Sequence, residues 1–185
     1  MKLNPLKCAF GVVSGKFLRF MVNSREIEAN PEKIRALVEM RSPFRIKDVQ
    51  SLNSQVAALN RFISKATDKC VPFFEAIKKA KNFEWTEHCE EAFQMLKEYM
   101  GQAPLLSKPK DGEKLFLYLG VSEHALSAAL VREEGKMQLP VYYISKRLVD
   151  AETRYSQMEK LAYCLVTASR KLRPYFQAHQ IEILT

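Results

Sequence analysis

Hydrophobic side chains recur every three or four residues in several stretches, which predicts amphipathic helices. The longest such stretch runs from about Ile46 to Lys65, and a second runs from Thr86, a favoured helix N-cap residue, to Gly101. A third is expected from Ser156 to about Leu172, where Pro174 closes it. Shorter helices are predicted at residues 30–40 and 73–80. In the third stretch the side chains expected to pack inward are Met158, Leu161, Ala162, Leu165 and Val166.

Short apolar runs bounded by turn residues predict the strands. A strand pair is expected within residues 6–22, with its turn at Ser14-Gly15. Three further strands are predicted at Leu115–Val121, Ala125–Arg132 and Val141–Ser145, and Gly135 marks a turn between the last two. Ile181–Leu184 starts another strand. The first of the three is apolar almost throughout, as in a strand covered on both faces.

These elements predict an α/β fold class, α+β overall, in which a helical part precedes a mixed β-sheet of order β-β-β-α-β. The expected divisions are a hairpin region at 1–30, a helical region at 31–101, a linker at 102–112 and a sheet domain at 113–185. The linker is inferred from Pro104, Pro109 and Gly112. Element order alone does not select one fold among those that begin in this way.

Composition narrows the class of protein. Hydrophobic residues make up 47% of the 185 residues, which is typical of a globular chain. No apolar run is long enough to span a bilayer, and the first residues lack the apolar stretch of a signal peptide. We therefore expect an intracellular protein, cytoplasmic or nuclear, with no membrane partner. The four cysteines and three histidines show no ligand spacing, so no metal site is expected.

Charge is distributed unevenly along the chain. The net charge is +8, and residues 1–83 hold 16 Lys and Arg against 7 Asp and Glu. Residues 84–107 are acidic, with 1 basic side chain against 5 acidic ones. A basic first half favours a polyanionic partner, although many basic domains bind no polyanion specifically.

Seven short motifs then occur in a fixed order along nearly the whole chain. They lie at Leu3–Phe10, Phe17–Val22, Ile27–Ile34, Ala58–Ile63, Phe83–Lys97, Pro140–Lys146 and Tyr155–Lys160. In this order they resemble the Pol polyprotein of gypsy-type long-terminal-repeat retrotransposons, of a plant-like lineage.

The resemblance assigns a role to each region. It implies that residues 1–30 are the end of a reverse transcriptase palm with a primer-grip hairpin, and that 31–101 are thumb-like. Residues 113–185 would be an RNase H-like domain that is incomplete at its C-terminus. The implied partners are an RNA–DNA hybrid or primer-template and the remainder of the polymerase polyprotein. The family uses magnesium, but no cofactor is expected for this chain.

The nuclease chemistry of the family needs clustered carboxylates that hold two magnesium ions. By resemblance, Gly120 stands where the family has its first Asp, and Leu161 stands where it has its catalytic Glu. Glu123 is expected to be a solvated turn residue. Glu159 is expected to form a capping box with Ser156 rather than to bind metal. The third acid of the family would follow Thr185. We therefore expect no catalytic residue and no metal ligand, and Gly120 and Leu161 should face each other where strand meets helix.

Nucleic-acid binding is the function that remains. The resemblance to a primer grip points to the hairpin and to one thumb residue, and basic side chains suit phosphate oxygens. The candidate binding residues are Lys7, Lys16, Phe17, Leu18, Arg19, Phe20 and Arg61. The hairpin could equally be basic without forming a site. Two other functions stay open: an active RNase H or reverse transcriptase fragment, and a decayed or domesticated remnant that acts as a protein-interaction module.

Overall fold

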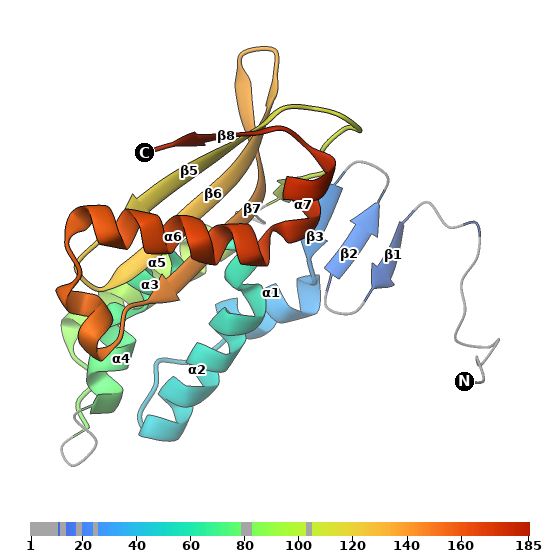
Figure 1. The fold of residues 1–185 in the computed structure, drawn as a ribbon. Helices are drawn as coiled ribbons and strands as arrows, with labels where there is room; N and C mark the ends of the chain where they lie inside the picture. The colour runs from blue at the N-terminus through green and yellow to red at the C-terminus, as the bar shows by residue number, and fades with distance from the viewer. Residues whose placement is uncertain (1–10, 12–13, 18–19, 24–25, 79–82, 103–104) are drawn as a thin grey trace, which may run out of the picture.

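The computed structural model describes residues 11, 14–17, 20–23, 26–78, 83–102 and 105–185 (Figure 1). The described part has two hydrophobic cores. The first core is formed by the helices of the first half together with Ala29 and Leu106, and the second lies between a β-sheet and the helix α6 (Gln157–Lys171). This division supports the predicted order of a helical part followed by a sheet domain.

The first sheet is antiparallel, with the strand order β1-β2-β3-β4. Its strands are β1 (Ser14–Phe17), β2 (Phe20–Asn23), β3 (Glu26–Ala29) and β4 (Leu105–Ser107). The prediction of a turn at Ser14-Gly15 is wrong, because both residues lie in β1 and pair with Asn23 and Val22. The pairing continues to Phe17 and Phe20.

The strand β4 corrects the predicted linker at 102–112. Leu106 pairs with Ile27 of β3 and is fully buried in the first core, while the neighbouring Leu105 is 45% exposed. Burial of an apolar side chain against the helices therefore fixes this segment, although the prolines around it suggested an unstructured connection.

The helices of the first half follow the predicted pattern, except that the helix expected to run from Ile46 to Lys65 ends at Leu59. They are α1 (Pro31–Val38), α2 (Ile46–Leu59), the 3-10 turn η2 (Asn60–Phe62), α3 (Ala66–Lys69), α4 (Val71–Lys78) and α5 (Glu87–Gly101). Asn30 caps α1 by accepting a hydrogen bond from the Glu32 amide, and Thr86 caps α5 by accepting one from the Cys89 amide. The cap at Thr86 was predicted. None of the helices that the structure describes is long and apolar enough to cross a membrane.

The second sheet has the order β7-β6-β5-β8. Its strands are β5 (Leu115–Val121), β6 (Ala125–Glu134), β7 (Met137–Arg147) and β8 (Ile181–Leu184). The first three are antiparallel neighbours, and β8 returns parallel to β5 after α6 and the short α7 (Arg173–Ala178). The mixed sheet of order β-β-β-α-β is confirmed, and Figure 1 shows α6 crossing one face of it.

Helix α6 is capped as predicted but packs through a different stripe. Ser156 accepts a hydrogen bond from the Glu159 amide, and its own amide donates to the Glu159 carboxylate at 2.8 Å, which completes the capping box. Met158 is 74% exposed and Val166 is 44% exposed, so the expectation that they pack inward is wrong. The side chains that face the sheet belong to Cys164, Ala168 and Leu172.

The two faces of the second sheet contact different parts of the molecule. On one face, Leu117, Leu126 and Ile144 pack with α6 in the second core. On the other face, Ser145 accepts a hydrogen bond from the Thr67 amide of α3 at 2.9 Å, and the Arg147 guanidinium lies over the Phe74 ring of α4. The sheet is therefore sandwiched between α6 and the helices of the first half.

A buried arginine strengthens the connection between the two sheets. The Arg132 side chain on β6 is 4% exposed, and its Nε donates to both carboxylate oxygens of Glu113, at 2.9 and 3.0 Å. Its Nη1 donates to Glu134 at 3.0 Å and to the Ser107 hydroxyl of β4 at 3.2 Å. These charge-assisted bonds satisfy a cation that would be costly to bury alone, and they link β4 to β6.

Candidate functional site

Gly120 lies on the sheet face that is turned away from α6. It pairs with Ser127 of β6, and a Cβ atom placed on it would lie 3.0 Å from the Ser127 hydroxyl oxygen. No atom of α6 lies within 4 Å of that position. Because side chains alternate along a strand, Leu117 and Leu119 face α6, whereas Tyr118 and Gly120 face the helices of the first half.

Leu161 lies on the other side of the same sheet. It is half-buried on α6, one turn before Cys164, whose thiol lies 3.3 Å from the Ser127 carbonyl oxygen. The prediction that Gly120 and Leu161 face each other is therefore wrong, because strand alternation separates them by the thickness of the sheet. In this structure the two positions do not form a common site, so their assignment as paired carboxylate positions loses its geometric basis.

The two nearby acids lie where the sequence predicted. The Glu123 side chain is 91% exposed in the turn between β5 and β6. Glu159 is engaged in the capping box, and the hydrogen bonds from Ser156 hold the pKa of its carboxyl below the usual value. Neither carboxylate points into a site with other acids.

The described residues do not provide the clustered carboxylates that would bind the two magnesium ions of the family that the sequence resembles. Among these residues, no three His, Cys, Asp or Glu side chains lie close enough to hold a metal ion together. The thiols of Cys70, Cys89 and Cys164 are buried and unpaired in disulfides. Burial raises the pKa of Cys70 to about 12, which makes its thiolate scarce near neutral pH.

A buried lysine at the end of β5 was missed by the sequence analysis. Lys160 is 8% exposed, and its ammonium lies 3.5 Å from the Ser122 carbonyl oxygen and 3.4 Å from that of Glu123. Its burial could have been predicted from its position four residues before Cys164, because residues four apart lie on the same face of a helix. The long side chain covers the sheet with its stem and delivers its charge to the carbonyl groups of the turn.

A cavity of about 210 Å³ lies beside Gly120, between the sheet and the Ser64-Lys65 turn. Hydroxyl groups line it, including those of Ser127 and Tyr143, and burial raises the pKa of the Tyr143 hydroxyl. Lys65 adopts a left-handed backbone conformation with a φ of 51° at the start of α3. The described residues around this cavity offer hydroxyl groups and one lysine side chain, and no carboxylate is among them.

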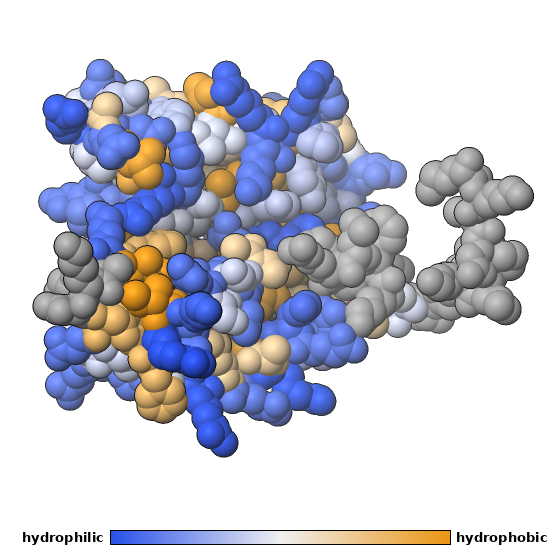
Figure 2. All heavy atoms as spheres, turned by 90° about the horizontal axis from the view of Figure 1, so that it is seen from below, coloured by the Kyte–Doolittle hydropathy of each residue, from blue (hydrophilic) through white to orange (hydrophobic). Residues whose placement is uncertain are grey.

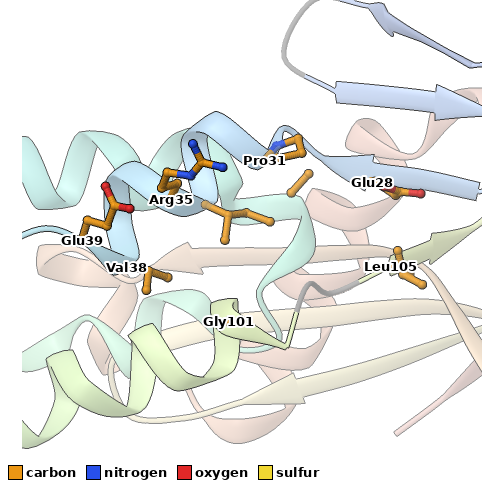
Figure 3. Close-up of a pocket in the computed structure, with 9 residues that line it drawn as sticks. Glu28, Pro31, Arg35, Val38, Glu39, Gly101 and Leu105 are labelled. Atoms are coloured by element: carbon orange, nitrogen blue, oxygen red, sulfur yellow. The ribbon is translucent and has the colours of Figure 1, made fainter.

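Another cavity, of about 340 Å³, lies between α1, β3, β4 and the end of α5 (Figure 3). Ile34, Val38 and Leu105 give it an apolar lining, and Arg35 of α1 and the C-cap residue Glu39 also line it. Two carboxylates, those of Glu28 and Glu39, are among its described lining residues.

The structure places the predicted binding residues only in part. Lys7, Leu18 and Arg19 lie outside the described residues. Lys16 and Phe17 are in β1 and Phe20 is in β2, so these three backbones belong to one antiparallel hairpin, as expected of a primer grip. The nucleic-acid role of the hairpin stays a prediction.

Arg61 is half-buried between the helical part and the sheet domain. Its guanidinium carbon lies 4.6 Å from the ring centroid of Tyr142 on β7. It also neighbours Tyr175 of α7: burial raises the pKa of that phenol, and the charge of Arg61 and a hydrogen bond from it oppose the rise. A guanidinium held over an aromatic ring in this way joins the two parts of the molecule, so it is poorly placed to contact phosphate.

Comparison with known proteins identifies the sheet domain together with the helix that precedes it. The profile of the family described as an RNase H-like domain found in reverse transcriptase matches residues 85–183. The chain belongs to this family. The match begins at Trp85, so it includes α5, whereas the domain expected from the sequence began at residue 113.

Relatives of the RNase H-like family that match the chain are much longer proteins. The chain is 30% identical to the retrovirus-related Pol polyprotein from transposon 297 of Drosophila melanogaster, over 99% of this chain and 17% of that protein. It is 28% identical to the corresponding polyprotein from transposon 412 of the same organism, over 100% of this chain and 15% of that protein. The chain thus spans about a sixth of the length of these relatives.

The fold extends beyond the family match. A foamy viral protease-reverse transcriptase, solved in complex with an RNA/DNA hybrid, superposes with a TM-score of 0.73 at 19% identity. The superposition covers 92% of this chain and 23% of that chain. It therefore includes the helical part as well as the RNase H-like domain.

Proposed function

We propose that this chain is a non-catalytic part of a gypsy-type retrotransposon reverse transcriptase and RNase H polyprotein, from a plant-like lineage, that holds an RNA–DNA hybrid or primer-template. The main support for this proposal is the shared fold: the helical part and the RNase H-like domain together superpose on a reverse transcriptase solved with an RNA/DNA hybrid. The motif order supports the gypsy-type lineage. The remainder of the polyprotein is the proposed protein partner, and an intracellular location goes with this role.

Two features of the chain support binding without cleavage. The net charge of +8 favours a polyanion, and counterion release makes such binding steeply dependent on salt. The described residues group no acids that could hold magnesium, which argues against the alternative of an active nuclease. The second alternative, a domesticated protein-interaction module, requires no affinity for a hybrid beyond generic attraction.

Binding can be tested on the unmodified chain and on a hairpin variant with Lys7→Ala, Lys16→Ala and Arg19→Ala. We expect the unmodified chain to bind a short RNA–DNA hybrid without sequence preference, and the variant to lose about 2 to 3 in the slope of log affinity against log salt. The control variant Lys78→Ala/Lys108→Ala/Lys136→Ala removes the same charge from three exposed positions outside the hairpin.

Two results would contradict the proposal. Absence of salt-dependent binding by the unmodified chain would reject the nucleic-acid role. Equal binding by the hairpin variant and the control variant would remove the hairpin from the interface. Arg61 is left unchanged here because its contacts with Tyr142 make its loss a change in stability as well.

A further inference from the structure

A cluster of three cations lies at the corner where α6 passes into α7. Arg170 and Lys171 are in the last turn of α6, and Arg173 is the first residue of α7. All three are exposed, and none of their side chains has a hydrogen bond or ion pair with another residue that the structure describes. We call Arg170, Lys171 and Arg173 the basic corner.

No acid interrupts the sequence around the basic corner. From Lys160 to Ile181 the chain contains no Asp or Glu, and the next acid, Glu182, pairs with Lys114. The positive potential of the corner is therefore not neutralised along its own segment, which is the electrostatic signature of a site for an anionic backbone.

The backbone of the corner is held firmly. Leu172, between Lys171 and Arg173, is fully buried in the second core. Pro174 occupies the first turn of α7, and Tyr175 packs edge-to-face against Tyr142 of β7. A fixed backbone that displays two arginines lowers the entropy lost when phosphate oxygens bind, and a guanidinium can donate two parallel hydrogen bonds to one phosphate.

The corner also lies beside the junction of the two parts of the molecule. Arg61 of η2, which follows α2, reaches Tyr175 just after the corner, so a duplex that follows the helical part can meet the corner on the RNase H-like domain. Cations in the last turn of a helix also stabilise the helix, because they interact favourably with its dipole. That explanation accounts for Arg170 and Lys171, but Arg173 lies beyond α6 and gains nothing from it.

We propose that the basic corner is a second contact surface for the phosphate backbone of the nucleic acid, separate from the hairpin. This inference rests on the proposed function and adds to it a binding surface within the RNase H-like domain. The occupant is recognised by its phosphate groups, not by its bases, so no sequence preference is expected.

The test compares two triple variants of the full chain. The corner variant is Arg170→Gln/Lys171→Gln/Arg173→Gln, and the matched control is Lys78→Gln/Lys108→Gln/Lys136→Gln, which removes the same charge from three exposed, scattered lysines. Affinity for a labelled RNA–DNA hybrid of about 20 base pairs is measured by fluorescence anisotropy from about 50 to 300 mM salt. We expect the slope of log affinity against log salt to fall by about 2 to 3 in the corner variant and by less than about 1 in the control.

Several outcomes would overturn the inference. Equal slopes for the two variants, while the unmodified chain binds the hybrid, would reject the corner and leave the proposed function standing. A lower melting temperature with an unchanged slope would assign the corner to the α6 dipole. Loss of binding to poly-glutamate but not to the hybrid would assign it to an acidic protein partner. If the triple variant does not fold, Arg173→Gln alone, outside α6, should still lower the slope by about 1.

Discussion

At the scale of single residues, Glu152 is a strongly perturbed carboxylate in a compact network. It accepts hydrogen bonds from the Tyr163 hydroxyl at 2.6 Å, from the Lys146 ammonium at 3.0 Å and from the Val149 amide at 3.0 Å. Together these bonds hold the pKa of Glu152 at about 2. The network joins β7, the 3-10 turn η4 (Asp150–Arg154) and α6, so its protonation affects the packing of the RNase H-like domain.

The Glu152→Gln variant should therefore lose acid sensitivity. The folded pKa of about 2 lies below the ordinary value of 4.5, so the ionised carboxylate stabilises the fold above about pH 4.5 and this contribution disappears as the pH falls toward 2. We expect the variant to be less stable by about 1 kcal/mol at pH 7, because the network is partly exposed, and to match the unmodified chain near pH 2. Urea unfolding across pH measures this, with Glu98→Gln as an exposed control. A constant difference between the chains at every pH would contradict the assignment.

At the scale of elements, helices and strands were predicted correctly where a local sequence pattern has a single structural explanation. Thr86 as a cap and the Ser156-Glu159 box located the starts of α5 and α6, and the apolar run Leu115–Val121 became β5 with the predicted bounds. The predictions were wrong where pairing with another segment of the chain determines the local structure. Ser14-Gly15 has the chemistry of a turn, but pairing with β2 draws it into a strand.

The strand β4 shows the same limit most clearly, because only three residues form it and their partner lies almost 80 positions earlier. Leu106→Ala should destabilise the fold by about 2 to 5 kcal/mol, since a fully buried leucine is replaced within a packed core. Leu105→Ala, at a position that is 45% exposed, should cost less than about 1 kcal/mol. Equal, small losses in chemical denaturation would mean that the segment is a linker after all.

At the scale of the whole molecule, the sequence predicted two parts but not how they meet. The contacts between them join residues far apart in the chain, such as Asp68 with Ser122 and Thr67 with Ser145. No local sequence pattern predicts such pairs. The resemblance predicts that Gly120 and Leu161 stand where the family has acids, and this assignment stays a prediction. Their placement on opposite sheet faces could be found only from the strand register. Alternation from the buried Leu117 was a usable signal for that placement.

Holding a hybrid without cutting it is the role that we propose for the chain, and one experiment measures both properties. Highly purified chain is incubated with end-labelled RNA–DNA hybrid and either magnesium or manganese, and bound hybrid and released fragments are quantified from the same sample. A site without clustered carboxylates cannot hold two divalent ions against water, so the account predicts bound, intact hybrid and no fragments above a mock preparation. Metal-dependent release of fragments above that background, abolished by chelation, would contradict the account.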